Sequence, residues 1–388
     1  MKRLIAVILS LILFVTHVFA DNSMEEAVET GGVVDLDIQA RSCMLLEEKT
    51  GEVIYAENEH EQMSPASISK IMTLILGFEA IEAGKISFED IVTCSENVSS
   101  QPGSRVFLST NEEISVHELF KCIAVASGND AAVALAEHIA GSESAFAEMM
   151  NAKAKELGMT NTVFQNCTGL DDMGTENIST AYDISIMARE LMKHEKIFEY
   201  TTIWMDTIRN GEFGLTNTNK LVRFYSGTTG LKTGSTDKAK YCVCATAKRD
   251  DMHLIAIVMG ADSVNMRNEQ AKVLLNYGFA NYATVTLPQV SDFENIPVLK
   301  GKTNFAIPEM CQNDTTMLIN KAEKGEVTYA VELEKELVAP IEKGQIIGQI
   351  SFFVASNKVA TCDLTAKEAV DRVTFGFNLL KVLQSMLF

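Results

Sequence analysis

The stretch Ser64-Pro65-Ala66-Ser67-Ile68-Ser69-Lys70-Ile71-Met72-Thr73 decides the fold. From Ile68 onward its apolar residues recur at i, i+3, i+4 and i+7, which predicts a helix from Ser67 to about Ala83. The proline and alanine before Ser67 suit a turn into that helix. Ser67 therefore stands at a helix N-terminus, where the dipole favours a developing alkoxide, and Lys70 projects from the same face one turn on.

A serine and a lysine in this arrangement predict nucleophilic catalysis. An ammonium in a low dielectric loses its proton more easily, so Lys70 can act as the base when it is neutral. Such a pair needs no histidine, and none of the six histidines lies close to the motif in sequence. A second Ser-x-x-Lys, at Ser235–Lys238, falls in a polar turn and is predicted to be only that.

A Ser-x-Asn motif at Ser127-Gly128-Asn129 separates two helical runs, 116–126 and 131–140. Its side chains can therefore point into a cleft, where the hydroxyl relays a proton and the amide holds a substrate carbonyl. The alternative is a helix C-cap followed by a new N-cap. The copy at 95–97 is predicted to lie in an exposed loop, and the copy at 263–265 to cap a helix that begins at Met266.

Lys232-Thr233-Gly234 lies in a strand-like run, 230–235. A second ammonium near Lys70 would lower the pKa of Lys70 further. Thr233 offers a hydroxyl to a carboxylate, and Gly234 leaves room for the serine helix. The alternative is a half-exposed strand with a solvated lysine. Another Lys-Thr-Gly, at 49–51, is centred on the turn of a hairpin predicted over 39–57.

The remaining patterns organise the chain after residue 20 into three parts. Helical patterns over 145–157, 182–194 and 266–277, with strands at 241–247 and 254–260, predict one α/β domain that ends near residue 282. Short strands and turns then predict a small all-β domain, 283–362. The mostly apolar end, 363–388, is predicted to be an amphipathic helix in a membrane interface, or alternatively a helix packed on the β domain.

Residues 1–20 have the pattern of a secretory signal peptide. Lys2 and Arg3 precede an apolar run, and Val18-Phe19-Ala20 ends in the small residue typical of a cleavage site. The run is shorter than the ~20 apolar residues of a membrane span, although an uncleaved anchor is the alternative. We therefore expect export to the outer face of the cytoplasmic membrane or the cell wall space.

Charge and composition limit the possible partners. The formal net charge is −19, with no offsetting basic cluster, so we expect no nucleic-acid partner. The eight cysteines lack the spacing of a disulfide framework, and Cys242 and Cys244 are predicted to be buried thiols rather than a disulfide or a metal site. His117-Glu118 lacks a second histidine four residues on, so no metal and no cofactor is expected.

The order of the three motifs, at 67, 127 and 232, resembles the active-site serine penicillin-recognising superfamily. The residues that flank Ser67, 64–73, resemble the low-molecular-mass D-alanyl-D-alanine carboxypeptidases of this superfamily. The same resemblance holds for the segments 126–131, 166–170, 179–183, 230–234 and 340–345. This resemblance implies an α/β (α+β) transpeptidase-like catalytic domain, with an antiparallel sheet between helices, followed by a β domain. It also implies that the substrate is a peptidoglycan stem peptide and that β-lactams are covalent inhibitors.

The resemblance also assigns roles. Ser67 would attack the bond between two terminal D-alanines, and Lys70 would take its proton. The backbone N–H groups of Ser67 and Ser235 would form the oxyanion hole. Substrate would contact three further groups of residues, namely Ser127 and Asn129 in the cleft, Lys232 and Thr233 at the carboxylate end, and Arg267, which aligns with a carboxylate-binding arginine.

Two positions depart from the family pattern. Ser235 stands where histidine is common, and Asn177 stands where histidine or glutamine is usual. Three alternatives stay open. A class A β-lactamase would need a Glu-x-x-Leu-Asn motif, and Glu212-Phe213-Gly214-Leu215-Thr216 misses its asparagine. A catalytically dead wall-binding protein is disfavoured by the intact motifs, and endopeptidase activity is not separated from carboxypeptidase activity.

Overall fold

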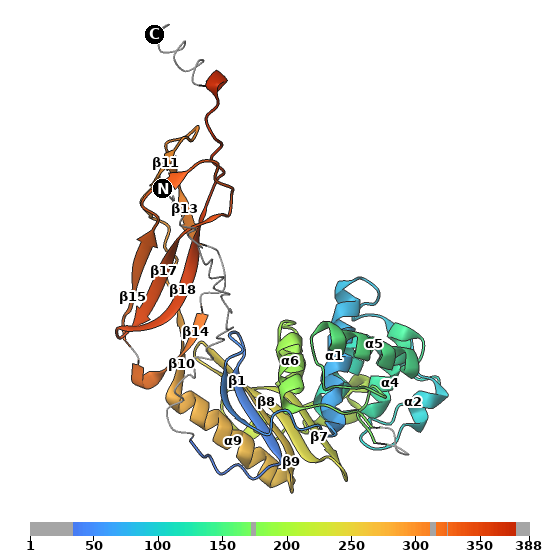
Figure 1. Cartoon of the computed structure of the whole chain (residues 1–388). Helices are drawn as coiled ribbons and strands as arrows, with labels where there is room; N and C mark the ends of the chain where they lie inside the picture. The colour runs from blue at the N-terminus through green and yellow to red at the C-terminus, as the bar shows by residue number, and fades with distance from the viewer. Residues whose placement is uncertain (1–33, 172–175, 311–315, 324, 378–388) are drawn as a thin grey trace, which may run out of the picture. The chain divides into compact units, whose positions relative to one another are not determined.

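The computed structural model describes residues 34–171, 176–310, 316–323 and 325–377 (Figure 1). The predicted signal peptide and the last eleven residues of the predicted terminal helix lie outside these residues. Within them, no helix is both long enough and apolar enough to cross a membrane.

A five-stranded antiparallel sheet organises the part of the chain before residue 282. Its strand order is β2-β1-β9-β8-β7. The central strand, β9, is buried at every position because its sequence is almost wholly apolar, as expected for a strand covered on both faces. The predicted hairpin at the N-terminal end is confirmed, and it joins the late strands in one sheet. The bounds are β1 Ser42–Glu47, β2 Val53–Glu57, β7 Thr228–Thr236, β8 Lys240–Arg249 and β9 Met252–Ala261.

Helices cover both faces of this sheet, as predicted. Helix α9 (Val264–Asn281) packs on β8 and β9 from one side, and α6 (Ala181–Met192) packs on β1 and β9 from the other (Figure 1). Helix α1 (Lys70–Glu82) lies beyond α6, and nearly all of its residues are buried because it is apolar on every side. The helix that begins at Lys70, the lysine of the serine–lysine motif, is therefore a rigid part of the core.

The remaining helices and strands complete this domain. They comprise the helices α2 Glu96–Ser100, α3 Val116–Lys121, α4 Asn129–Ala140, α5 Glu143–Glu156, α7 Ile197–Thr201 and α8 Leu221–Phe224, and the strands β3 Ile91–Thr93, β4 Glu113–Ser115, β5 Met205–Ile208 and β6 Phe213–Thr216. Helices α1, α4 and α5 pack together, and one apolar core joins them to the sheet.

The described chain after residue 282 is a small β domain, as predicted. Its largest sheet has the strand order β13-β18-β17-β15. Two small clusters of buried apolar residues form the core of this domain. The bounds are β10 Tyr282–Thr286, β11 Ile296–Leu299, β12 Phe305–Ala306, β13 Pro308–Met310, β14 Thr316–Asn320, β15 Val327–Leu333, β16 Leu337–Val338, β17 Ile346–Val354 and β18 Asn357–Ala366.

Two local predictions are wrong. The predicted terminal helix cannot begin at residue 363, because β18 continues to Ala366 and buries Leu364 in the β-domain core; residues 375–377 are the first helical ones. The copy at 95–97 does not lie wholly in a loop, because Asn97 is part of α2 and Ser95 caps this helix, with its hydroxyl accepting a hydrogen bond from Val98 N. The predictions that Ser263 caps a helix and that Cys242 and Cys244 are buried free thiols are confirmed.

Candidate active site

The serine–lysine motif folds as a tight turn that leads into α1. Ala66 has a positive φ of 47°, and a 3₁₀ turn follows over Ala66–Ser69. The α-helix therefore begins at Lys70 and not at Ser67 as predicted. Ser67 is half-buried, whereas Lys70 is fully buried. The serine is thus partly accessible to solvent, while the amine of Lys70 is shielded from water.

The amine of Lys70 is held by three oxygen atoms. Its Nζ donates to Ser67 Oγ at 3.0 Å, Asn129 Oδ1 at 2.6 Å and Thr168 O at 2.7 Å. An ammonium has three N–H donors, and a neutral amine has two and one lone pair. When Lys70 is neutral, Asn129 and Thr168 can accept its two N–H bonds, which leaves the lone pair directed at the hydroxyl of Ser67. This geometry is that of a general base beside a nucleophile.

Burial lowers the pKa of Lys70 to about 7, against the opposing influence of Cys167, Asp130 and Glu143. A substantial fraction of the amine is therefore neutral at neutral pH. Burial is the main cause of this lowering. The pKa of Lys232 is also held well below its usual range, by burial first and then by repulsion from Lys70 and Arg267.

Ser127 and Asn129 reach this place because the chain is distorted between α3 and α4. A π-helical turn over Cys122–Ala126 precedes Ser127, which has a left-handed φ of 60°. Strained backbone of this kind is concentrated at functional sites. Asn129 begins α4, and its side-chain amide is already engaged, because Oδ1 accepts from Lys70 and Nδ2 donates to Pro102 O at 2.7 Å. Its first role in this structure is to hold Lys70.

The next residue, Asp130, was not singled out in the sequence. It is buried, and its carboxylate accepts backbone hydrogen bonds from Val106 and Leu108 at 3.0–3.1 Å. Ser104 O in the same segment accepts from Asn129 N at 2.7 Å. The start of α4 therefore fixes the segment around residues 102–108 beside the site.

Strand β7 closes the opposite side. Lys232 is buried and donates to Ser127 Oγ at 2.7 Å and to Thr233 O at 2.9 Å. The hydroxyl of Thr233 donates to Thr218 Oγ1 at 2.8 Å. Thr218 was also missed, since it belongs to no motif, although it fixes the orientation of the Thr233 hydroxyl.

Gly234 allows β7 to touch the nucleophile turn. A Cβ built on Gly234 would lie 2.7 Å from Pro65 O and 3.1 Å from Ile68 N. The first distance is shorter than real Cβ contacts and the second is tighter than most of them, so glycine is required for this approach. The exposed residue that follows, Ser235, therefore lies beside the turn that holds Ser67. This proximity is what an oxyanion hole built from the backbone N–H groups of Ser67 and Ser235 needs.

Arg267 lies behind the same strands. It is buried in α9 and donates to Cys242 O at 3.4 Å and, through Nε, to Asn268 Oδ1 at 3.2 Å. Cys242 pairs with Gly234 across β7 and β8, so the guanidinium lies next to the Lys-Thr-Gly strand. Burial lowers the pKa of Arg267 to about 10, yet at neutral pH it remains a cation.

The structure thus brings the predicted residues to one place from four segments, namely the serine turn, the α3–α4 connection, β7 and α9. Its centre is a nucleophile with a buried base and a second buried amine, and the cation of Arg267 lies behind them. Among the described residues, no group of three or more His, Cys, Asp or Glu could hold a metal ion. Such a site is equipped for acyl transfer to a serine, on a substrate with an anionic end.

Comparisons with known proteins identify relatives over almost the whole chain. A family model described as "D-alanyl-D-alanine carboxypeptidase" matches residues 27–263, and one described as "Penicillin-binding protein 5, C-terminal domain" matches residues 282–372. The D-alanyl-D-alanine carboxypeptidase DacF of Bacillus subtilis is 40% identical over 383 residues, which cover 97% of this chain and 96% of that protein.

Solved structures give the same result. Penicillin-binding protein 5 from Haemophilus influenzae matches with a TM-score of 0.78 and 31% identity, covering 88% of this chain and all of that one. Penicillin-binding protein D2 from Listeria monocytogenes in its ampicillin-bound form matches with a TM-score of 0.59 and 31% identity, covering 63% of this chain and 100% of that one.

Proposed function

Since this chain belongs to the D-alanyl-D-alanine carboxypeptidase family of low-molecular-mass penicillin-binding proteins, we propose that the site described above removes the terminal D-alanine from peptidoglycan stem pentapeptides, with Ser67 as nucleophile. The protein is a serine-type carboxypeptidase that acts on the cell wall. β-Lactams acylate the same serine. The observation that carries the assignment to Ser67 is the 3.0 Å contact of its hydroxyl with the buried amine of Lys70.

The contacts of Ser67, Lys70 and Ser127 support the following path for acylation. The Oγ of Ser67 attacks the carbonyl carbon of the penultimate D-alanine while its proton passes to the lone pair of Lys70. The backbone N–H groups of Ser67 and Ser235 stabilise the negative oxygen of the tetrahedral intermediate. The carbon–nitrogen bond then breaks, and the proton held by Lys70 passes through the hydroxyl of Ser127 to the leaving amine. Lys232, Thr233 and Arg267 bind the carboxylate of the leaving D-alanine.

Deacylation reverses these roles. Lys70, neutral again once its proton has left with the amine, takes a proton from water, and the resulting hydroxide attacks the ester carbon. The ester bond to Ser67 breaks, Oγ recovers the proton, and the shortened peptide leaves. The one glutamate that came near to the β-lactamase motif, Glu212, is exposed. That exposure supports slow turnover of penicillin, as expected of a carboxypeptidase.

Finer features of the location are also part of the proposal. Residues 1–20 are a signal peptide cleaved after Ala20, the catalytic domain spans 21–282, and the β domain follows. The apolar end of the chain contacts the outer face of the cytoplasmic membrane. Support comes from the basic and apolar pattern of residues 1–20 and from Phe375, which is 86% exposed at the start of the terminal segment.

The test of the proposed function is Ser67→Ala. We expect this variant to lose both D-alanine release from a pentapeptide and covalent labelling by a fluorescent penicillin, while its melting temperature stays near that of the native protein. The native protein is the positive control in both assays. Full labelling of the variant would show that another residue is the nucleophile.

A further inference from the structure

Asn177 is a buried amide that makes four hydrogen bonds beside the active site. It is 1% exposed. Its Nδ2 donates to Ser69 Oγ at 2.9 Å and to Asn166 O at 3.0 Å. Its Oδ1 accepts from Gln165 N at 2.7 Å and from Asn166 N at 3.2 Å. A side chain with every polar atom engaged in this way is fixed in position, and it fixes what it binds.

These bonds join two segments that both contact Lys70. Ser69 belongs to the turn between the nucleophile and its base. Gln165 and Asn166 begin a segment whose Thr168 carbonyl accepts from Lys70 at 2.7 Å. Asn166 in turn fixes the backbone around Thr168, because its Oδ1 accepts hydrogen bonds from Thr168 N at 3.1 Å and from Gly169 N at 2.7 Å.

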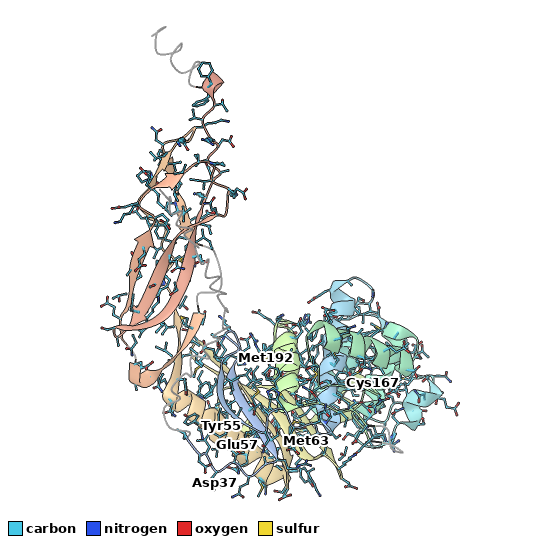
Figure 2. The ribbon with its side chains drawn as sticks, viewed as in Figure 1. Asp37, Tyr55, Glu57, Met63, Cys167 and Met192 are labelled. Atoms are coloured by element: carbon cyan, nitrogen blue, oxygen red, sulfur yellow. The ribbon has the colours of Figure 1, made fainter. Side chains whose placement is uncertain are left out.

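The same segment is pressed against the nucleophile turn. Gly169 has a φ of +77°, and a Cβ on it would lie 1.9 Å from Ala66 O. Beside it, Cys167 O accepts from Thr73 Oγ1 of α1 at 2.7 Å (Cys167 is labelled in Figure 2). The Thr168 carbonyl is therefore held by backbone packing from one side and by the amides of Asn166 and Asn177 from the other.

We propose that Asn177 is a positioning residue for catalysis, and this inference rests on the proposed function. It holds the Thr168 carbonyl where that oxygen accepts one N–H of neutral Lys70. Asn129 accepts the other N–H, so the lone pair is left on Ser67. Without the Thr168 carbonyl the amine can rotate, and its lone pair spends less time on the hydroxyl. Asn177 therefore acts on the proton transfer without touching substrate.

The test is Asn177→Ala, followed by the rate of acylation by a fluorescent penicillin between pH 5 and 9. A small misplacement of a catalytic group can cost up to ~100-fold, and we expect the plateau rate to fall by about tenfold or more. The apparent dissociation constant for the penicillin should change far less. A carbonyl that accepts from an ammonium favours the charged form, so its loss should move the acid limb to lower pH by about half a unit.

The matched control is Asn151→Ala. Asn151 braces the same segment one step earlier, because it donates to Phe164 O at 2.7 Å and accepts from Phe164 N at 2.8 Å. Among the described residues, its hydrogen bonds go to Phe164 and Ala147 and not to the nucleophile turn. We expect it to lower the melting temperature and to leave the pH profile of acylation in place. Asn177→Gln, which keeps both donor and acceptor, should recover part of the rate.

Three results separate the outcomes. An unlabelled native protein would overturn the proposed function itself. The inference alone would be overturned if the native protein is labelled and the Asn177→Ala variant keeps both the native rate of acylation and the native acid limb of the pH profile. Equal effects of Asn151→Ala and Asn177→Ala on the acid limb would also overturn it, since both would then act only through the general stability of the segment. If Asn177→Ala does not fold, Asn177→Ser, whose single hydroxyl cannot replace all four hydrogen bonds, takes its place as the loss variant. Asn177→Gln then remains the rescue variant.

Discussion

The Nζ atom of Lys232 lies 2.7 Å from the Oγ atom of Ser127, although 105 positions separate the two residues in the chain. Both are almost fully buried, at 1% and 4% exposed. Lys232 donates and the hydroxyl oxygen accepts, so the hydroxyl's own proton remains available to a third group. Ser127 can therefore hand a proton to a leaving amine and remain hydrogen-bonded while it does so.

The first prediction concerns Ser127→Ala. An amine leaves only after protonation, whereas the oxygen of an ester is a better leaving group. Loss of one general acid typically costs 10²–10⁴-fold, so we expect release of D-alanine to fall by about 100-fold. Hydrolysis of the matching peptide that ends in D-Ala-D-lactate should fall much less. Steady-state rates on both substrates give the ratio.

Ser95→Ala is a matched control for this experiment. It removes the hydroxyl of another Ser-x-Asn copy, the one that caps α2. We expect a loss of about 1 kcal/mol in the free energy of unfolding, as is usual for an N-cap serine, and an unchanged amide-to-ester ratio. An unchanged ratio in Ser127→Ala would rule out proton relay through Ser127.

The second prediction is a dependence of acylation on pH. Burial lowers the pKa of Lys70 to about 7, and only the neutral amine can accept the proton of Ser67. The rate of acylation by penicillin should therefore level off above pH 7 and fall about tenfold for each pH unit below it. Stopped-flow labelling from pH 5 to 9 measures this limb, with the folded fraction followed at each pH. A flat profile would show that Lys70 is not the base.

The parts of this site that could be predicted from the sequence share a property: their side chains are close along the chain or lie in short motifs. One helical turn relates Ser67 to Lys70, and the break between two helical runs marked Ser127 and Asn129. The 3₁₀ turn at Ala66–Ser69 was not predicted, because apolar periodicity is the same for both kinds of helix over four residues.

Other contributions could not be predicted, because they depend on tertiary contacts. Thr168 acts through a backbone carbonyl, so its side chain gives no signal. Asp130 and Thr218 hold backbone and hydroxyl groups of distant segments. In the sequence, Asn177 is only a departure from a family pattern, because its four hydrogen bonds join segments that only the fold brings together.

The third prediction tests the approach of β7 to the nucleophile turn through Gly234→Ala. The new methyl group would meet Pro65 O at 2.7 Å and Ala66 Cβ at 3.1 Å, and neither is the flexible end of a long side chain. The strand must therefore move away, which displaces Ser235 N–H from the oxyanion hole. Removal of one such donor typically costs about 10²–10³-fold in rate, so we expect a loss of that order in both D-alanine release and penicillin labelling.

Gly214→Ala in β6 is the matched control, because a Cβ there meets nothing within 4 Å, and its activity should equal that of the native protein. A fully active Gly234→Ala variant would mean that the contact between β7 and the serine turn has no part in stabilising the oxyanion.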